Sequence, residues 1–291
     1  EMGGGIKPSV LRMSGVTEGG KTSCSLAFMK NFLENVSNAR GVYIKSEGRL
    51  GKEIQERTQI KFVNNADDFK DGTCFVFKTN IFESAISLTR LLVKNNPNNK
   101  KYFFIYDSMD ALVPRHDIEG SFEDANKVAG GALLTADFLR KMALAFTEGG
   151  HIAVLISQIR STVRINPYQA IDPKITNASG GNAALHYSDW ILEFQPRNLD
   201  DYIWAGERNK SERLGHFCKI IFRKSPNEKT GTHVSYPIKY GKNDGRNIWI
   251  EYEIIDYLLT WDMVKVKGKW FYVDNSLIED LKKNKFIIPE Q

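Results

Sequence analysis

The segment GVTEGGKT, at 15–22, has the residue types and the spacing of a phosphate-binding loop. It fits the Walker A pattern G-x-x-x-x-G-K-[ST], in which glycines let consecutive backbone N–H groups turn toward a phosphate. In such a loop Lys21 reaches the β- and γ-phosphates of ATP, and the hydroxyl of Thr22 is a ligand of Mg²⁺. The alternative is a glycine-rich turn that fits by accident; a strand before the loop and a helix after it distinguish the two. The residues expected to bind nucleotide are Gly15, Val16, Thr17, Glu18, Gly19, Gly20, Lys21, Thr22 and Ser23.

Two carboxylates stand at the ends of apolar segments elsewhere in the chain. KYFFIYD predicts a strand that ends at Asp107, which is the Walker B pattern, and Asp107 could complete the Mg²⁺ site. GVYIKSE predicts a strand that ends at Glu47, and a carboxylate there could polarise an attacking water. Each has a simpler alternative, because Asp107 could cap the next turn and Glu47 could be a solvated loop residue.

The apolar segment HIAVLISQ predicts a buried strand that ends at Gln158, and a long polar stretch follows it. Loops longer than about 12–15 residues are uncommon in compact domains and are usually functional or disordered. Arg160, Arg164 and Lys174 could neutralise phosphates, and Tyr168 could stack on nucleotide bases without reading their sequence. The alternative is a disordered surface loop.

The elements that must position these residues alternate between apolar strands and amphipathic helices as far as the long loop. Strands are predicted at 8–15, 41–47, 74–79, 101–107 and 151–158, and helices at 21–36, 82–95 and 127–150. This alternation predicts an α/β fold with a mostly parallel sheet and helices on both faces.

After the loop the pattern changes. Three strands, at 189–195, 216–224 and 233–240, follow without a helix between them, which predicts antiparallel strands at one edge of the sheet. A helix at 251–261, a hairpin near Lys267 and Gly268 and a helix at 276–283 then predict a small α+β module. We therefore expect two domains, 1–240 and 241–291.

The composition is that of an ordinary globular chain of 291 residues, 42% hydrophobic and 26% charged. No apolar run approaches the roughly 18 residues of a membrane helix, and nothing at the N-terminus indicates export. We expect no membrane partner and a cytoplasmic location. Cys24, Cys74 and Cys218 lack metal-type spacing, so we interpret them as core residues in a reducing compartment.

The charge is unevenly distributed. The net charge is +5, but 207–246 alone carries ten Lys and Arg against four Asp and Glu, which is +6. A basic stretch of this kind suits partners that carry phosphates. Lysines on a solvated strand edge are the alternative explanation.

Together these segments resemble the RecA-type recombinases, over roughly residues 3–272. GVTEGGKT and YIKSEGRL match the family's phosphate loop and its acidic strand end, and IYDSMDALVPRHDIEG matches its Walker B strand and the start of its first DNA loop. LISQIRSTV resembles the strand that ends in Asn-Gln-Ile-Arg, and SGGNAALHY the Gly-Gly-Asn segment that closes the second DNA loop. DYLLTWDMVKVKGKWFYV resembles the family's C-terminal hairpin module. The Gln-Ile-Arg and Gly-Gly-Asn pair is the specific feature, and phage recombinases of the UvsX kind are the nearest in character.

The resemblance implies a RecA-like P-loop NTPase core that acts as a DNA-dependent ATPase with ATP and Mg²⁺. It implies binding of single-stranded DNA in a helical filament of many copies, followed by pairing and strand exchange with homologous duplex DNA. Such a protein serves homologous recombination and DNA repair, near the nucleoid of a bacterial or phage-infected cell.

The resemblance also implies roles for single residues. Glu47 falls on the family's catalytic glutamate, and Gln158 on the residue that senses the γ-phosphate and begins the second DNA loop. That loop, 159–179, would be closed by Gly180, Gly181 and Asn182. Lys224, with Arg223 as its companion, would touch the γ-phosphate of a neighbouring protomer; the alternative is a solvated lysine-rich strand.

Three departures from the family pattern bear on these expectations. The chain begins at Glu1 without the N-terminal elements that relatives use to hook onto a neighbour. His186 stands in place of a phenylalanine that couples neighbours, and Ile54 lies near the place of an aromatic that stacks on adenine.

Two other functions stay open on the sequence. One is a RecA-fold motor, such as a hexameric helicase or a KaiC-like ATPase. The other is a non-catalytic DNA-binding mediator.

Overall fold

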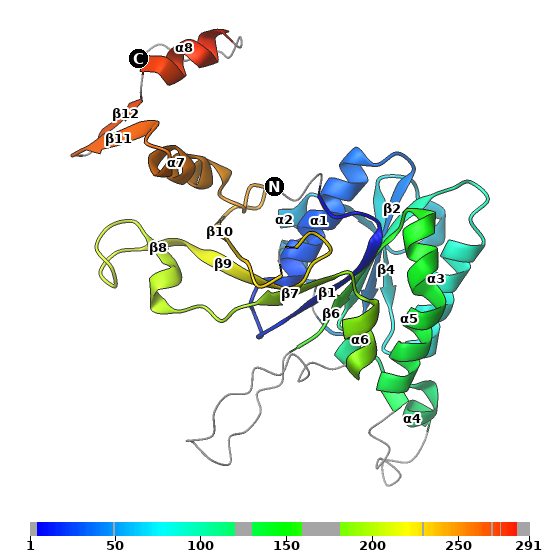
Figure 1. The fold of residues 1–291 in the computed structure, drawn as a ribbon. Helices are drawn as coiled ribbons and strands as arrows, with labels where there is room; N and C mark the ends of the chain where they lie inside the picture. The colour runs from blue at the N-terminus through cyan, green and yellow to red at the C-terminus, as the bar shows by residue number, and fades with distance from the viewer. Residues whose placement is uncertain are drawn as a thin grey trace, which may run out of the picture.

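The computed structural model describes residues 5–48, 50–119, 130–158, 181–228, 230–268, 270–273 and 275–283 of the chain. Ten strands of this part form one sheet in the order β10-β9-β7-β1-β6-β5-β2-β4-β3, with β8 paired to β9 (Figure 1). The parallel strands are β1 (Ser9–Gly15), β2 (Ala39–Lys45), β3 (Lys61–Val63), β4 (Thr73–Lys78), β5 (Lys101–Asp107), β6 (Ile152–Ile156) and β7 (Trp190–Phe194). The antiparallel strands are β8 (Tyr202–Trp204), β9 (Arg213–Lys224) and β10 (His233–Lys239).

Helices cover both faces of this sheet. One face carries α1 (Lys21–Asn35) and α2 (Lys52–Thr58), and the other carries α3 (Phe82–Lys94), α5 (Gly130–Gly149) and α6 (Gly181–Tyr187) (Figure 1). A short helix, α4 (Arg115–Glu119), precedes α5 in the chain. The predicted α/β architecture is confirmed.

Strand β5 shows why the central strands are apolar throughout. Phe103 and Ile105 pack into the core cluster beneath α1, while Tyr102, Phe104 and Tyr106 pack into the cluster beneath α3 and α5. Successive side chains of a strand point to opposite faces, so a strand covered on both faces needs an apolar residue at every position. The strand therefore delivers Asp107 to its carboxyl end from a rigid, dry core.

Two predicted strand ends are wrong by two residues. Strand β2 ends at Lys45 and β6 at Ile156, so Glu47 and Gln158 lie beyond their strands. The cause in each case is a change of hydrogen-bond partner. The N–H groups of Ser46 and Glu47 both donate to the single carbonyl of Asp107, and the N–H of Gln158 donates to a side chain.

The expectation of three antiparallel strands is correct for two of them and wrong for β7. Strand β7 runs parallel to β1, with Leu11 opposite Trp190, and β9 and β10 then extend the edge antiparallel. The physical reason is α6, which the sequence pattern did not predict. This helix makes the connection from β6 to β7 a crossover, and a crossover returns the chain in its original direction.

The C-terminal elements lie at the antiparallel edge. They are α7 (Ile250–Thr260), the hairpin of β11 (Val264–Lys267) and β12 (Trp270–Val273), and α8 (Asn275–Lys283). Tyr252 of α7 lies against Phe217 of β9 with ring centroids 5.7 Å apart. The hairpin and α8 lie beyond α7, away from the sheet (Figure 1). The predicted helix, hairpin and helix are confirmed, and the boundary at 240/241 stays a prediction.

All three cysteines are buried and free, in agreement with their interpretation as core residues. Burial raises the pKa of Cys24 to about 12. Within the described ranges, no helix combines the length and the apolar character that crossing a bilayer requires.

Candidate active site

The predicted phosphate loop lies between β1 and α1, as its motif requires. Gly15 has a φ of +143° and Gly20 a φ of +105°, which L side chains rarely adopt. A Cβ atom on Gly15 would stand 2.3 Å from the carbonyl oxygen of Phe194 on β7. The loop therefore packs directly on the neighbouring strand, with no room for a side chain at its first position.

Lys21 opens α1, and its ammonium lies back over the loop. The Nζ atom donates to the carbonyl oxygens of Gly15, at 2.9 Å, and Val16, at 2.6 Å, and the residue is only 4% exposed. The N-terminus of α1 adds the partial positive charge of the helix dipole at the same place. Both features suit the phosphates of a nucleotide.

Asp107 lies against the first turn of α1. Thr22 donates its hydroxyl to Asp107 Oδ2 at 2.8 Å, and Tyr43 of β2 donates its hydroxyl to the same oxygen at 2.5 Å. Burial and the adjacent carboxylate raise the pKa of Tyr43, so its hydroxyl keeps the proton that it donates. The carboxylate is 2% exposed and is satisfied by these two donors.

Glu47 lies beside Asp107, although it comes after the end of β2. Ser108 donates its hydroxyl to Glu47 Oε1, and Ser46 donates its hydroxyl to the carbonyl of Ser108 at 2.7 Å. The peptide bond between Asp107 and Ser108 is cis. The structure thus brings together the loop lysine, the hydroxyl of Thr22 and both predicted carboxylates at one edge of the sheet.

These groups fit a nucleotide bound with Mg²⁺. The tight turns at Gly15 and Gly20 form the concave backbone that surrounds a phosphate. The oxygens of Thr22 and Asp107 are the hard ligands that Mg²⁺ prefers, and Mg²⁺ completes its shell with water and phosphate oxygens.

Sequence reasoning missed Tyr43 and Ser108 as partners of the carboxylates. Tyr43 carried a signal, because a tyrosine in an otherwise apolar strand needs a partner for its hydroxyl. Strand β2 lies beside β5 in the sheet, with Tyr43 opposite Ile105. That pairing places the hydroxyl near Asp107, but the order of strands was needed to see it.

Arg197 is a further residue at the loop that sequence reasoning missed. Its Nη2 donates to the carbonyl of Glu18 at 2.9 Å and lies 4.0 Å from the Glu18 carboxylate. Glu18 has a φ of +61°, so this cation supports the loop at a strained position. No local signal could have found it, because 179 residues separate the two in sequence.

The backbone of Gln158 is held by a side chain that follows β5 in the chain. Its N–H donates to Asp110 Oδ2 at 2.5 Å, and Asp110 lies in the 3-10 helix that follows Asp107. The residue is partly buried, at the carboxyl end of the sheet. It is therefore on the edge of the sheet where Asp107 and the phosphate loop lie.

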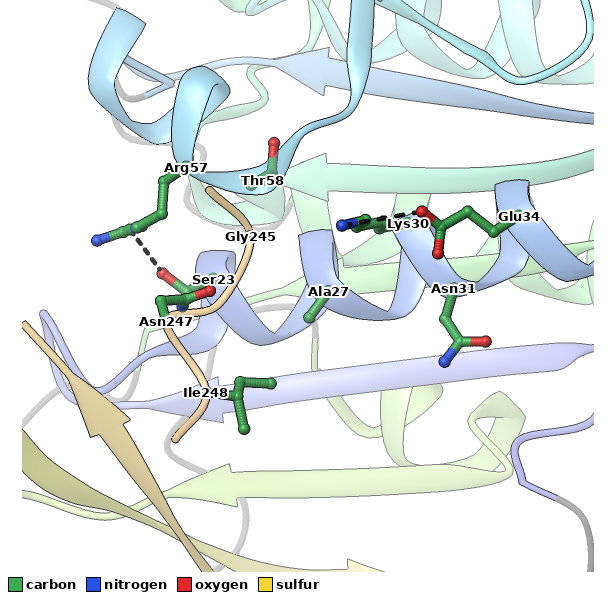
Figure 2. A pocket seen from close by; sticks show the side chains of 10 residues that line it. All are labelled: Ser23, Ala27, Lys30, Asn31, Glu34, Arg57, Thr58, Gly245, Asn247 and Ile248. Atoms are coloured by element: carbon green, nitrogen blue, oxygen red, sulfur yellow. Dashed lines mark hydrogen bonds and ion pairs between the residues drawn. The ribbon is translucent and has the colours of Figure 1, made fainter. Parts of the chain in front are cut away.

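A pocket of about 200 Å³ lies beside the phosphate loop, on the outer side of α1 (Figure 2). Ser23 lines the pocket, and its hydroxyl accepts a hydrogen bond from Arg57 of α2, another lining residue, at 3.2 Å. Its lining is mostly polar and comes from α1, α2 and the segment before α7: Ser23, Ala27, Lys30, Asn31, Glu34, Arg57, Thr58, Gly245, Asn247 and Ile248. Ile54 does not line it, because that side chain packs against the core beneath α1.

The two predicted interface cations lie at the end of β9 and contact groups of their own chain. Arg223 forms two hydrogen bonds to Glu193 of β7, at 2.6 and 2.9 Å. Burial disfavours the charged form of Glu193, but these hydrogen bonds outweigh burial and hold the pKa of Glu193 below its usual range. Lys224 Nζ donates to the carbonyls of Leu185 and His186, both at 3.0 Å, at the end of α6.

The predicted DNA-binding residues are largely beyond what the structure describes. Arg160, Arg164, Tyr168, Lys174 and Gly180 lie outside the described residues. Gly181 and Asn182 form the start of α6. Their predicted role therefore stays a prediction.

The chain is similar to known proteins along most of its length. The family model of the RecA N-terminal domain matches residues 1–220. The protein named Protein RecA from Rickettsia canadensis is 25% identical over 283 residues, which cover 97% of this chain and 74% of the relative. Protein RecA from Campylobacter fetus subsp. fetus is 25% identical over 299 residues, covering 99% and 77%, and that from Porphyromonas gingivalis is 28% identical over 199 residues, covering 67% and 52%. Because the family match spans more than half of the chain and includes the loop at 15–22 and Asp107, the chain belongs to the RecA family of recombinases.

Proposed function

We propose that the chain is a DNA-dependent ATPase that coats single-stranded DNA as a helical filament and promotes pairing and strand exchange with homologous duplex DNA. Membership of the RecA family supports the recombinase class. The ATPase part rests on one observation above all. Thr22 is hydrogen-bonded to Asp107 at 2.8 Å beside the buried ammonium of Lys21, which joins the groups that phosphoryl transfer requires.

The residues of the site divide the work of hydrolysis between them. Lys21 and the N-terminus of α1 counter the negative charge on the β- and γ-phosphates. Thr22 and Asp107 would hold Mg²⁺, which neutralises charge between the phosphates when bound. Glu47 is the general base that polarises and orients the attacking water. Its hydrogen bond from Ser108 fixes the direction of the carboxylate, and a base needs that geometry.

The pocket in Figure 2 is the place we assign to the nucleoside of ATP. It begins at Ser23, directly after the Mg²⁺-ligating hydroxyl of Thr22. The amide of Asn247 offers donors and an acceptor to the edge of a base, and Asn31, whose Oδ1 accepts from Asn35, offers its NH₂ group as a donor. Because Ile54 packs against the core, selectivity for the base would depend on these amides.

The DNA-binding part rests on the family and on the sequence after Gln158. Arg160, Arg164 and Lys174 would neutralise phosphates, with Tyr168 stacking on a base. Binding of this kind is nearly independent of sequence. For single strands, each neutralised phosphate adds roughly −0.7 to the slope of log affinity against log salt.

The deciding experiment is an ATPase assay of the full chain with and without single-stranded DNA, together with DNA binding at several salt concentrations. We expect hydrolysis that DNA stimulates and a DNA affinity that falls steeply with salt. DNA binding without hydrolysis would identify a mediator instead. Hydrolysis by closed rings in electron microscopy, in place of helical filaments, would identify a motor.

A further inference from the structure

A fully buried arginine lies in β1, just before the phosphate loop. Arg12 is 2% exposed, and its Nε donates to Ser157 Oγ at 3.2 Å. It lies on the face of the sheet that Val10 shares, beneath α5 and α6. Burial lowers the pKa of Arg12, and the carboxylate of Asp110 opposes that change. Arg12 and Asp110 contact consecutive residues of the chain, because Arg12 donates to Ser157 and Asp110 accepts from Gln158.

Asp110 in turn holds the backbone where the chain leaves β6. Its Oδ2 accepts the N–H of Gln158 at 2.5 Å. The N–H of Ser157 still donates to a strand, to the carbonyl of Met13 at 2.9 Å. One residue later the sheet no longer provides an acceptor, and a buried N–H must find one elsewhere. The carboxylate of Asp110 therefore takes the place of a strand carbonyl as the acceptor for the N–H of Gln158.

We propose that Asp110 is a positioning residue that fixes the direction in which the chain leaves the sheet at Gln158 and thereby couples the nucleotide site to DNA binding. The inference rests on the proposed function. Its basis is a cluster that brings together Arg12 of β1, Asp110 after β5, and Ser157 and Gln158 after β6. Strand β1 leads from Arg12 into the phosphate loop, β5 leads through Asp107 to Asp110, and β6 leads to Gln158.

The cluster can transmit a movement of the backbone because its residues have little freedom to rearrange around it. Arg12 and Ser157 are buried, and the bonds from Arg12 to Ser157 and from Gln158 to Asp110 hold the chain at two consecutive residues. A shift of the phosphate loop or of Asp107 would therefore change the starting direction of the segment after Gln158. Such a change gives DNA a different affinity for the two nucleotide states, which any ligand-driven switch requires.

The test compares two double variants of the full chain. Arg12→Met with Asp110→Ala removes the carboxylate together with its cation, so that no unpaired charge is left in the core. Arg12→Met with Asp110→Asn differs from it only by an amide, whose oxygen can still accept the N–H of Gln158. If the role of Asp110 depends on its acceptor oxygen, the two variants differ, whereas the loss of the two charges affects both variants equally.

Asp201→Ala is the matched control. Asp201 is a buried aspartate that accepts the N–H of Asn198 at 2.7 Å and forms an ion pair with Lys219. It lies between β7 and β8, at the antiparallel edge. Its loss removes a carboxylate that accepts a backbone N–H, as the loss of Asp110 does, but away from Gln158.

Two measurements are made on each protein. The first is the ratio of single-stranded DNA affinity with a non-hydrolysable ATP analogue to that with ADP, expected at about 5- to 150-fold in the parent. The second is hydrogen exchange at the amide of Gln158. We expect the Ala double variant to lose the ratio and the protection, the Asn double variant to recover most of both, and Asp201→Ala to keep both.

Three results would overturn the inference. They are a ratio that the Ala double variant retains, equal losses in the Ala and Asn double variants, and an equal loss in Asp201→Ala. A parent whose ratio is one overturns the proposed function and the coupling with it. In that case the exchange measurement still shows whether Asp110 holds Gln158, so the two failures are distinguishable.

Discussion

Glu47 illustrates at the scale of a single residue how neighbours assign a role. Its carboxylate is oriented by Ser108, whose backbone follows the Mg²⁺-binding candidate Asp107. The Oε1 atom that accepts this bond has a close counterpart in the amide oxygen of glutamine. A glutamine at position 47 can therefore keep the hydrogen bond from Ser108 while it lacks the negative charge of the carboxylate. The substitution thus tests the role of the charge as a base with the orientation of the side chain retained.

We predict that Glu47→Gln retains ATP binding but hydrolyses ATP about 10²- to 10⁴-fold more slowly, the usual loss when a general base is removed. Single-turnover hydrolysis and nucleotide binding measure the two effects separately. Glu53→Gln, an exposed glutamate in the first turn of α2, is the control and should keep the parental rate. Parental turnover in Glu47→Gln would show that this carboxylate is a solvated loop residue.

Asn247 tests the assignment of the nucleoside to the pocket in Figure 2. We predict that Asn247→Ala raises the KM for ATP roughly 2- to 12-fold, the equivalent of one net hydrogen bond, with little change in kcat. Contacts to the base act equally in the ground state and the transition state, so they affect binding rather than chemistry. The control is Asn64→Ala, at an exposed position after β3. An unchanged KM would place the nucleoside elsewhere.

At the scale of elements, the sequence predicted what depends on local pattern. The central strands and the long helices follow from continuous apolar runs and helical spacing, and β5 has the bounds that its run of apolar residues predicts. The strand, glycine turn and helix around 15–22 were predictable because they are consecutive. Asp107 could be placed at the same edge of the sheet because a run of apolar residues, typical of a parallel strand, ends at it.

What depends on contacts distant in sequence could not be predicted. The ends of β2 and β6 are set by the carbonyl of Asp107, at the end of β5, and by the side chain of Asp110, in the 3-10 helix that follows. The direction of β7 depends on α6, a helix of seven residues with too little periodicity to recognise. The contact of Arg197 with Glu18 has no local signal of any kind.

Gly15 provides the prediction at the scale of elements, because it is where the loop packs on β7. We predict that Gly15→Ala destabilises the fold by about 1–3 kcal/mol and weakens nucleotide binding, since its Cβ would clash with the Phe194 carbonyl and its φ is positive. Thermal unfolding and ATP binding are the measurements. Gly51→Ala is the control, with a φ of −65° and open space around its Cβ. Parental stability in Gly15→Ala would contradict the close packing.

At the scale of the whole molecule, the position of Lys224 bears on the proposed assembly into a filament. Its ammonium donates to the last carbonyls of α6, and α6 follows directly after the predicted DNA-binding segment. For Lys224 to reach the γ-phosphate of a neighbour, it must exchange these two carbonyls for the phosphate. The predicted DNA-binding segment leads into α6, and α6 contacts Lys224. Through these contacts, DNA binding in one protomer would change the active site of the next.

Head-to-tail contacts of this kind are heterologous: each protomer gives a residue to one neighbour and receives one from another. We predict that Lys21→Ala and Lys224→Ala are each inactive with single-stranded DNA, and that an equal mixture regains activity. In the mixture a Lys224→Ala protomer has an intact loop and can receive Lys224 from a Lys21→Ala neighbour, which completes about one site in four if assembly is random. Steady-state hydrolysis by the mixture is the measurement. Replacing Lys21→Ala by the double variant Lys21→Ala with Lys224→Ala gives the control, because that protomer has no Lys224 to contribute. Activity of the mixture equal to the sum of its parts would confine Lys224 to its own chain, as the donor that caps α6.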